Sequence, residues 1–124
     1  MDTSDFKQHY SQQFNTELEE VRSHVLAMGG LVEQQLRTAI DALDRSYSGS
    51  AEDVVSNDIK VNAFDVEIDE RCTQILALRK PSASDLRLVL TVIKMTADLE
   101  RIGDEAKRVA RMALGTPKSD TGRN

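Results

Sequence analysis

The sequence predicts an all-α protein that folds as an antiparallel bundle of three long helices. Apolar residues recur at steps of three and four along three segments, and no segment shows the alternation of a strand. Only a few residues separate the segments, so neighbouring helices are expected to run antiparallel. Aromatic residues make up 4% of the 124 residues, which suits helices better than sheets. We expect one bundle at 14–115, a frayed segment or short helix at 1–13 and a disordered tail at 116–124.

The first helix is predicted from a long apolar seam that begins at Phe14. Its members are Phe14, Leu18, Val21, Val25, Met28, Val32, Leu36, Ala39 and Leu43. The seam stops before Tyr47-Ser48-Gly49-Ser50, which predicts a turn. Gly29 and Gly30 interrupt it at a cost of about 1 kcal/mol each relative to alanine. We interpret them as a site of close helix–helix approach or a slight bend.

The second helix is expected to start at Ser50, which can cap it together with Asp53. Its apolar stripe is Val54, Val61, Phe64, Ile68, Cys72 and Ile75, with Leu76 beside it. Pro81 should end this helix, because the residue before a proline is pushed out of helical geometry. Ser82 or Ser84 then caps the third helix, which runs to Leu114 and ends at Gly115.

The third helix carries two apolar faces. Leu86, Leu90, Ile93 and Ala97 share one face, and the next residues along it are Glu100 and Asp104. The opposite side carries Met95, Leu99, Ile102, Ala106, Val109 and Ala113. We therefore expect the first face to be buried in the first half of the helix and the opposite side in the second half. The acidic end of the first face would then have a different role.

The second helix repeats the acidic spacing with Asp65 and Asp69, which flank its apolar stripe. Like charges four residues apart destabilise a helix by a few tenths of a kcal/mol. Two such pairs on adjacent helices would repel further unless a cation lay between them. Carboxylates without a nearby histidine or thiolate suit hard ions such as magnesium, calcium, manganese or iron. A zinc site and the Glu-x-x-His pattern of diiron bundles are not indicated.

A simpler reading of these pairs stays open. Among 21 acidic residues, some will fall four apart by chance. Glu100 and Asp104 would then form ordinary surface ion pairs with Arg101, Lys107, Arg108 and Arg111, each worth under about 1 kcal/mol. Spacing alone does not decide between the two readings.

Composition excludes several other classes of function. The net charge of −5 argues against nucleic-acid binding and against tight adsorption to an anionic membrane. Cys72 is the only cysteine, so no intrachain disulfide can form, and we expect it to be a small core residue. No signal peptide or membrane span is seen, so we expect a cytoplasmic protein that reaches the membrane only through a partner.

Three longer strings resemble the PhoU family of phosphate-uptake regulators. They are ELEEVRSHVLAMGGLVEQQL (Glu17–Leu36), VNAFDVEIDERCTQILALRKP (Val61–Pro81) and SDLRLVLTVIKMTADLERIGDEAKRVA (Ser84–Ala110). ASDLR followed by DLERIGD is the most specific part. The resemblance covers the chain from about Phe14 to Leu114 and implies one three-helix repeat of a kind that normally occurs twice in tandem.

The resemblance also implies a site. In the family, each repeat carries an E(D)-x-x-x-D motif on its second and third helices, associated with multinuclear metal clusters. Here these motifs are Asp65-Val-Glu-Ile-Asp69 and Glu100-Arg-Ile-Gly-Asp104. Asp98 lies in the same DLERIGD string, but the helical wheel turns it about 120° from the centre of the face.

The function implied is that of a non-enzymatic negative regulator of the phosphate-starvation (Pho) response. Such a protein links the ATPase subunit of the phosphate ABC transporter to a sensor histidine kinase at the inner membrane. With only one repeat present, the surface that a second repeat covers would be exposed, and we expect a homodimer. The alternatives are a structural helical interaction module without metal and, less favoured, a carboxylate–metal hydrolase, for which no nucleophile–base pair is visible.

Overall fold

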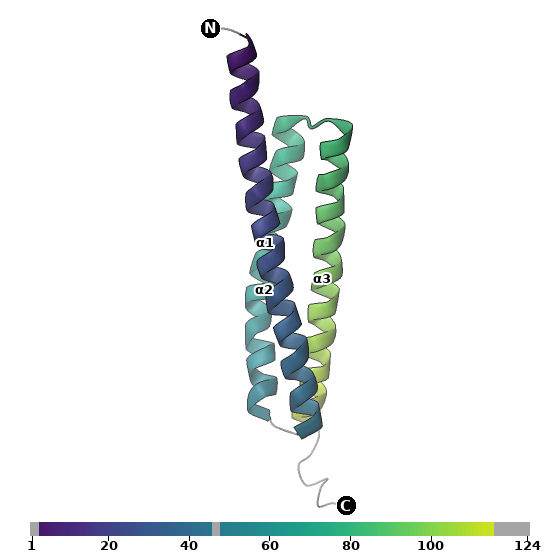
Figure 1. Ribbon diagram of the computed structural model, residues 1–124. Helices are drawn as coiled ribbons and strands as arrows, with labels where there is room; N and C mark the ends of the chain where they lie inside the picture. The colour runs from purple at the N-terminus through teal and green to yellow at the C-terminus, as the bar shows by residue number, and fades with distance from the viewer. Residues whose placement is uncertain (1–2, 46–47, 116–124) are drawn as a thin grey trace, which may run out of the picture.

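The computed structural model is a bundle of three helices: α1 (Thr3–Arg45), α2 (Ser48–Arg79) and α3 (Ala83–Gly115). It describes residues 3–45 and 48–115, and its side chains over 12–44 and 52–115. α1 and α3 run in one direction and α2 in the other, and each helix packs along the other two (Figure 1). The predicted all-α, antiparallel three-helix bundle is confirmed. No described helix contains a stretch apolar enough to cross a bilayer.

Two helix starts differ from the sequence-based expectation. α1 begins at Thr3, so residues 3–13, which were expected to be frayed or to form a short helix, belong to one continuous helix with the rest of α1. α2 begins at Ser48, so Ser50 lies inside the helix and the predicted cap of Ser50 with Asp53 is wrong. Ser50 followed three residues later by Asp53 matches the sequence pattern of a helix cap, but the helix begins two residues earlier, at Ser48. The expected tail at 116–124 lies outside the described residues.

The connection between α2 and α3 is as predicted. α2 ends at Arg79, and Lys80 adopts a left-handed φ of 45° directly before Pro81. The backbone amide of Asp85 donates to Oγ of Ser82 at 3.4 Å, and the Ser82 hydroxyl donates to the Asp85 carboxylate at 3.1 Å. Ser82, rather than Ser84, therefore caps α3.

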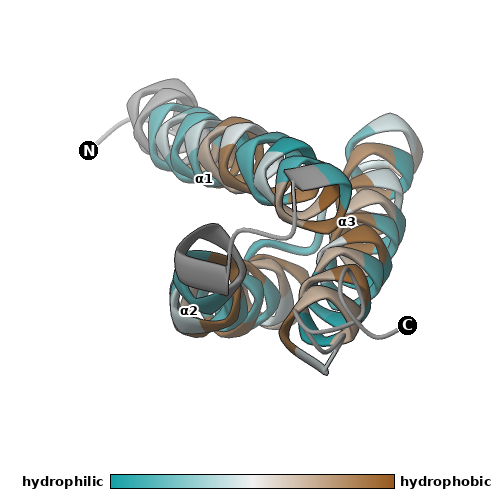
Figure 2. Cartoon of the chain, turned by 90° about the horizontal axis from the view of Figure 1, so that it is seen from below, coloured by the Kyte–Doolittle hydropathy of each residue, from teal (hydrophilic) through white to brown (hydrophobic). Residues whose placement is uncertain are grey.

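The core consists of two clusters stacked along the bundle axis, and the inward sides of the helices are visible end-on in Figure 2. The larger cluster contains Phe14, Val21, Val25, Met28, Val32, Val61, Ile68, Cys72, Ile75 and Val89. The smaller one contains five alanines and one valine: Ala39, Ala42, Ala106, Ala110, Ala113 and Val54. The predicted seams of α1 and α2 are largely confirmed, except that Ala42 is buried at the end of α1 while Leu43 is 43% exposed.

The predicted buried face of α3 is wrong in its first half. Leu86 and Leu90 are 38% and 49% exposed, and Ala97 is also exposed. The buried residues of α3 are Val89, Thr96, Gly103, Ala106, Ala110 and Ala113. α3 packs against α1 and α2 together, so only a narrow strip of its surface faces both helices. The space there suits small side chains. The larger apolar residues lie on either side of that strip, and Met95 and Ile102 of the stripe expected to be buried on the opposite side are 48% and 42% exposed.

Candidate functional site

The four predicted carboxylates lie on the α2–α3 side of the bundle. Asp65, Asp69 and Glu100 line a hollow of about 120 Å³ together with Ile68, Ile93, Thr96 and Ala97. Asp104 follows Glu100 by one helical turn, and its charge acts on Glu100. Asp65 and Glu100 are partly buried, whereas Asp69 and Asp104 are exposed. The structure therefore brings three predicted residues to one hollow and the fourth to its edge.

The electrostatics of this hollow centre on Glu100. A hydrogen bond shared with Asp65 raises the pKa of Glu100 above its ordinary value, and partial burial raises it further. The negative charges of Asp65, Asp104 and Asp58 act in the same direction. Two ionised carboxylates in such contact repel one another, and a cation between them would relieve that repulsion.

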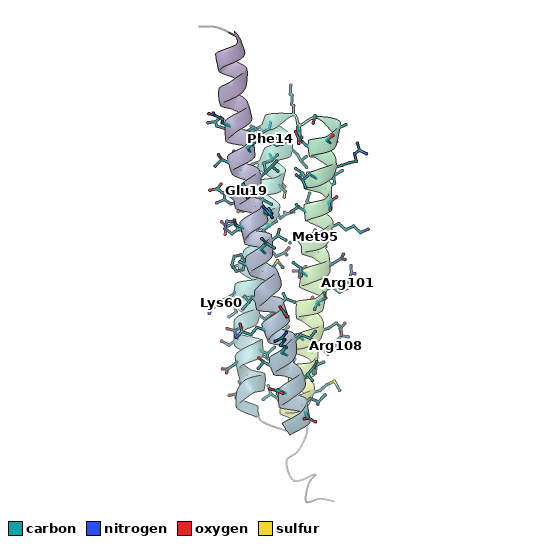
Figure 3. All side chains as sticks on the ribbon, viewed as in Figure 1. Phe14, Glu19, Lys60, Met95, Arg101 and Arg108 are labelled. Carbon is teal, nitrogen blue, oxygen red and sulfur yellow. The ribbon has the colours of Figure 1, made fainter. Side chains whose placement is uncertain are left out.

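Of the four basic residues expected to neutralise this site, three have other acidic partners, and no ion pair of the fourth, Arg111, is found among the described residues. Arg101 pairs with Asp98 at 3.3 Å, and Arg108 pairs with Glu105 at 3.2 Å. Both arginines project from the outer side of α3 (Figure 3). The ammonium of Lys107 lies 2.9 Å from the carboxylate of Asp58. Within residues 12–44 and 52–115, no lysine or arginine forms an ion pair with any of the four predicted carboxylates.

The chemistry of the hollow suits a hard cation, because all the polar side chains that line it offer oxygen atoms as ligands. In the part of the chain that the structure describes, however, no three His, Cys, Asp or Glu side chains converge closely enough to hold a metal ion. Asp65 and Glu100 already meet, so a cation between them would need the exposed side chain of Asp69 or Asp104 to rotate inward. Asp98 points to a different partner, Arg101, and lies outside the hollow.

A buried polar cluster just below the hollow was missed by the sequence reasoning. Asp58 is only 4% exposed; it accepts from Lys107 at 2.9 Å and from Asn62 at 3.3 Å. Gln35 of α1 is 1% exposed and donates to the backbone carbonyl of Val54 at 3.0 Å. One oxygen of Asp58 and one of Gln35 have no hydrogen-bond partner. The signal was present in the sequence: Asp58 occupies the missing position in the α2 stripe between Val54 and Val61.

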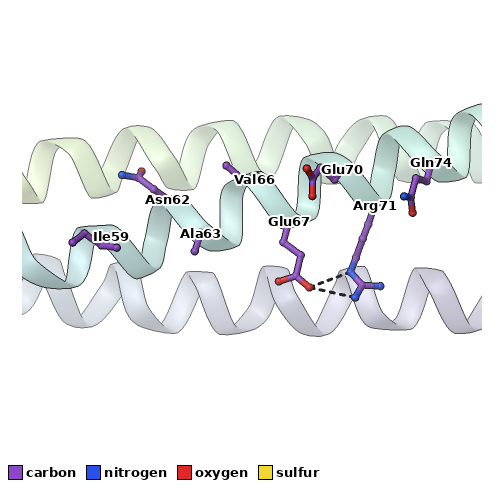
Figure 4. Close-up of a pocket in the computed structure, with 8 residues that line it drawn as sticks. All are labelled: Ile59, Asn62, Ala63, Val66, Glu67, Glu70, Arg71 and Gln74. Atoms are coloured by element: carbon purple, nitrogen blue, oxygen red, sulfur yellow. Dashed lines mark hydrogen bonds and ion pairs between the residues drawn. The ribbon is translucent and has the colours of Figure 1, made fainter.

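The α1–α2 side carries a separate network of charges. Arg71 reaches Glu20 at 2.7 Å and Glu67 at 3.3 Å, and His24 lies 3.2 Å from Glu67. Figure 4 shows Glu67 and Arg71 beside an open depression along α2, whose other lining residues also belong to α2. Glu20 and Glu67 thus each have a basic partner, unlike Asp65 and Glu100 among the described residues.

Farther along the same side, Glu17 and Arg79 form a two-pronged pair with both distances at 2.9 Å. The hydrogen bond from Arg79 lowers the pKa of Glu17, and the positive charges of Arg79 and Arg71 add to this against the effect of burial. This pair ties the end of α2 to α1. Its geometry is that of a structural contact.

Comparison with known proteins gives a consistent result. The model of the PhoU domain matches residues 25–113. The phosphate-specific transport system accessory protein PhoU homolog of Pseudomonas putida is 57% identical over 106 residues, which are 86% of this chain and 41% of that protein. The phosphate-specific transport system accessory protein PhoU of Escherichia coli K12 is 50% identical over 114 residues, 92% of this chain and 47% of that protein.

The crystal structure of PhoU from Pseudomonas aeruginosa has the same fold, with a TM-score of 0.80 and 55% identity over 82% of this chain and 48% of that one. The chain thus spans about half the length of the relatives it matches. The matched domain includes the α2–α3 hollow and most of the three-helix core. The chain belongs to the PhoU family, whose members here are accessory proteins of phosphate-specific transport.

Proposed function

We propose that the chain is a metal-binding regulatory adaptor of phosphate homeostasis that negatively regulates the Pho response. It would work at the cytoplasmic side of the inner membrane, between the ATPase subunit of the phosphate ABC transporter and a sensor histidine kinase. Membership of a family of transport accessory proteins supports the regulatory role. The long exposed faces of the three helices offer the surface that such contacts need. A homodimer is part of the proposal.

The observation that carries the metal part is the uncompensated carboxylate pair. Asp65 and Glu100 come from different helices and share a hydrogen bond, and neither has a basic partner among the residues that the structure describes, whereas the nearby Lys107, Arg101 and Arg108 all have acidic ones. A divalent cation between them would offset the repulsion of their charges. Asp65, Asp69 and Glu100 are the residues that would hold it, with Asp104 at the edge. When bound, the ion would supply positive charge that links α2 to α3.

Titration calorimetry with Mn²⁺ tests this assignment. We expect the variant with Asp65→Asn, Asp69→Asn, Glu100→Gln and Asp104→Asn to lose binding. The matched control carries Asp98→Asn and Glu105→Gln, which remove two α3 carboxylates that are already paired with arginines. The control should bind Mn²⁺ like the unaltered chain. Equal binding by all three proteins would remove the hollow from the proposal.

Thermal unfolding separates the proposal from the alternative of a structural helical module without metal. A ligand present at about 100 times its Kd stabilises a protein by about 2.7 kcal/mol. For a chain of this size that raises Tm by several degrees. If the chain is instead a structural module that binds no metal, Mn²⁺ should change the Tm of the unaltered chain and of the four-residue variant by the same small amount, as any salt would. Binding of the transporter ATPase and the kinase domain can then be measured separately, with and without Mn²⁺.

A further inference from the structure

The buried polar cluster below the hollow contains two oxygen atoms that accept no hydrogen bond. They are Oδ1 of Asp58, a residue that is 4% exposed, and Oε1 of Gln35, which is 1% exposed. Among the described residues, neither oxygen has a donor. Buried acceptors are nearly always paired, because an acceptor removed from water without a donor is destabilising. Two such atoms in one cluster indicate a site for a donor from outside the chain.

The orientation of the Gln35 side chain is fixed by the contact that it makes. Its amide nitrogen donates to the backbone carbonyl of Val54 at 3.0 Å. Turning the amide over would place its oxygen against that carbonyl, and two acceptors would then face each other. Oε1 is instead directed toward α3, where a Cβ built on Gly103 would lie 3.7 Å from it.

The two unpaired oxygens belong to the same layer of the bundle. The carbonyl that holds Gln35 belongs to Val54, which precedes Asp58 by one turn of α2. Lys107, whose ammonium lies 2.9 Å from Oδ2 of Asp58, follows Gly103 by one turn of α3. One oxygen thus approaches this layer from α1 and the other from α2, and the residue of α3 beside them is a glycine.

Gly103 leaves room at this point of the core. It is buried, and a Cβ on it would have its nearest neighbours at 3.5 to 3.7 Å: one methyl carbon each of Val61 and Val32, and Oε1 of Gln35. These are ordinary contact distances, so the space accepts a group of the size of a methyl, and a water molecule is of similar size. We call this space the Gly103 niche and define it by Gly103, Gln35, Asp58, Val32 and Val61.

The chemistry of the Gly103 niche suits water better than a metal ion. Two unpaired oxygens face it, whereas a hard cation takes six or more oxygen ligands. The charge of Asp58 is already offset by Lys107. A water molecule has two hydrogens for the two acceptors, and the ammonium of Lys107 has further N–H groups to donate to the water oxygen. Together these give the roughly three hydrogen bonds that buried waters usually make.

We propose that one ordered water molecule occupies the Gly103 niche and donates to Oε1 of Gln35 and to Oδ1 of Asp58. It would connect α1 to α2 where Lys107 connects α2 to α3, so one polar layer would join all three helices inside the core. The hollow above is lined only by α2 and α3, and the charge of Asp58 acts on Glu100 within it. The water would therefore link α1 to the candidate site, whether or not the hollow binds a cation.

Gly103→Ala and Gly30→Ala test the niche as a matched pair in thermal unfolding. Gly30 is exposed and a Cβ on it would meet nothing within 4 Å, so alanine should raise Tm through its better helix propensity. A dry core predicts the same rise for Gly103→Ala, because the methyl fits at ordinary contact distances. If water occupies the niche, the methyl displaces it and leaves both acceptors without a donor, so Tm should fall by several degrees. A Tm that does not fall would overturn the proposal.

Gln35→Met separates the displacement of water from simple crowding. Methionine is of similar length and has no amide oxygen, so the water loses one of its two acceptors in this variant. Gly103→Ala should then lower Tm less in the Gln35→Met background than in the unaltered chain. Crowding by the methyl would lower Tm equally in both backgrounds, and that result would contradict the proposal.

Nuclear magnetic resonance detects the water directly in the unaltered chain. A water held in the core gives nuclear Overhauser cross-peaks, at the water frequency, to nearby carbon-bound protons. We expect them at the α protons of Gly103 and at the methyl groups of Val32 and Val61. They should vanish in Gln35→Met, which keeps Lys107 and so excludes relay through its exchanging ammonium protons. Absence of these cross-peaks in the unaltered chain, or their persistence in Gln35→Met, would overturn the assignment.

Discussion

Replacing Lys107 by methionine should destabilise the bundle strongly, because it leaves the Asp58 carboxylate buried without its cation. The ammonium lies 2.9 Å from Oδ2 of Asp58, and the two side chains are 24% and 5% exposed. Asn62 is the only other side chain that donates to this carboxylate among the described residues, and Oδ1 has no partner. Breaking one half of a buried pair usually costs about 3 to 5 kcal/mol.

The structure also indicates where in this range the cost falls. The partial exposure of Lys107 shows that some water reaches the pair, which lowers the cost. We therefore expect a loss of about 3 kcal/mol at pH 7.

Urea unfolding followed by circular dichroism at pH 7 measures this loss. Lys94→Met, an exposed lysine on the same helix, is the matched control and should lose under about 0.5 kcal/mol. Combining Lys107→Met with Asp58→Leu removes both charges, and most of the stability should return. The reasoning fails if Lys107→Met costs no more than the control, or if adding Asp58→Leu restores none of the lost stability.

Three further predictions follow from the side-chain chemistry. The pKa of Glu100 is raised in the folded chain, so folding favours the protonated form of this side chain. The stability that its protonation contributes is fully present below the ordinary pKa of 4.5 and is lost as the pH rises through the raised pKa. Glu100→Gln without metal should thus raise the free energy of unfolding by a few tenths of a kcal/mol at pH 7 and not at pH 3; an equal gain at both would contradict the raised pKa of Glu100. The lowered pKa of Glu17 has the opposite sign: its contribution is present above 4.5 and is lost as pH falls. Arg79→Leu should cost about 1 kcal/mol at pH 7 and flatten the acid limb of the stability profile measured by urea unfolding, whereas an unchanged limb would argue against the pair. Burial raises the pKa of the Cys72 thiol, so a thiol reagent should label the native chain far more slowly than the chain in urea, and similar rates would place the thiol outside the core.

The periodicity of the sequence was sufficient to predict the fold because α1 and α2 each have one dominant apolar stripe. In α3 it was insufficient, since apolar residues occur on both sides of a strip made of Thr96, Gly103 and alanines. A helical wheel counts hydrophobicity, so it selected Leu86 and Leu90, which the structure leaves exposed. Only the placement of α3 between two helices identifies the narrow strip as the buried one.

The candidate site was predictable to a similar extent. Spacing on α2 and α3 placed Asp65, Asp69 and Glu100 near one another, and the structure brings them to the same hollow. Spacing could not show which cations pair with which carboxylates, because those pairs depend on rotamers and on heights along different helices. That limitation concealed the pairing of Asp58 with Lys107, which removes one of the cations available to neutralise Glu100.

The alanine cluster formed by Ala39, Ala42, Val54, Ala106, Ala110 and Ala113 gives the bundle two ends of unequal strength. Methyl groups let the helices approach closely, but each removes far less apolar surface from water than the valines, isoleucines and methionine of the other cluster. A part of a protein that buries less apolar surface opens locally at a lower free energy. The end of the bundle near Arg45 and Ser48 should therefore fray before the rest unfolds. The end of the bundle that holds the alanine cluster would then open locally while the end that holds the larger cluster stays folded. The buried ion pair of Asp58 and Lys107 lies at the boundary between the two parts.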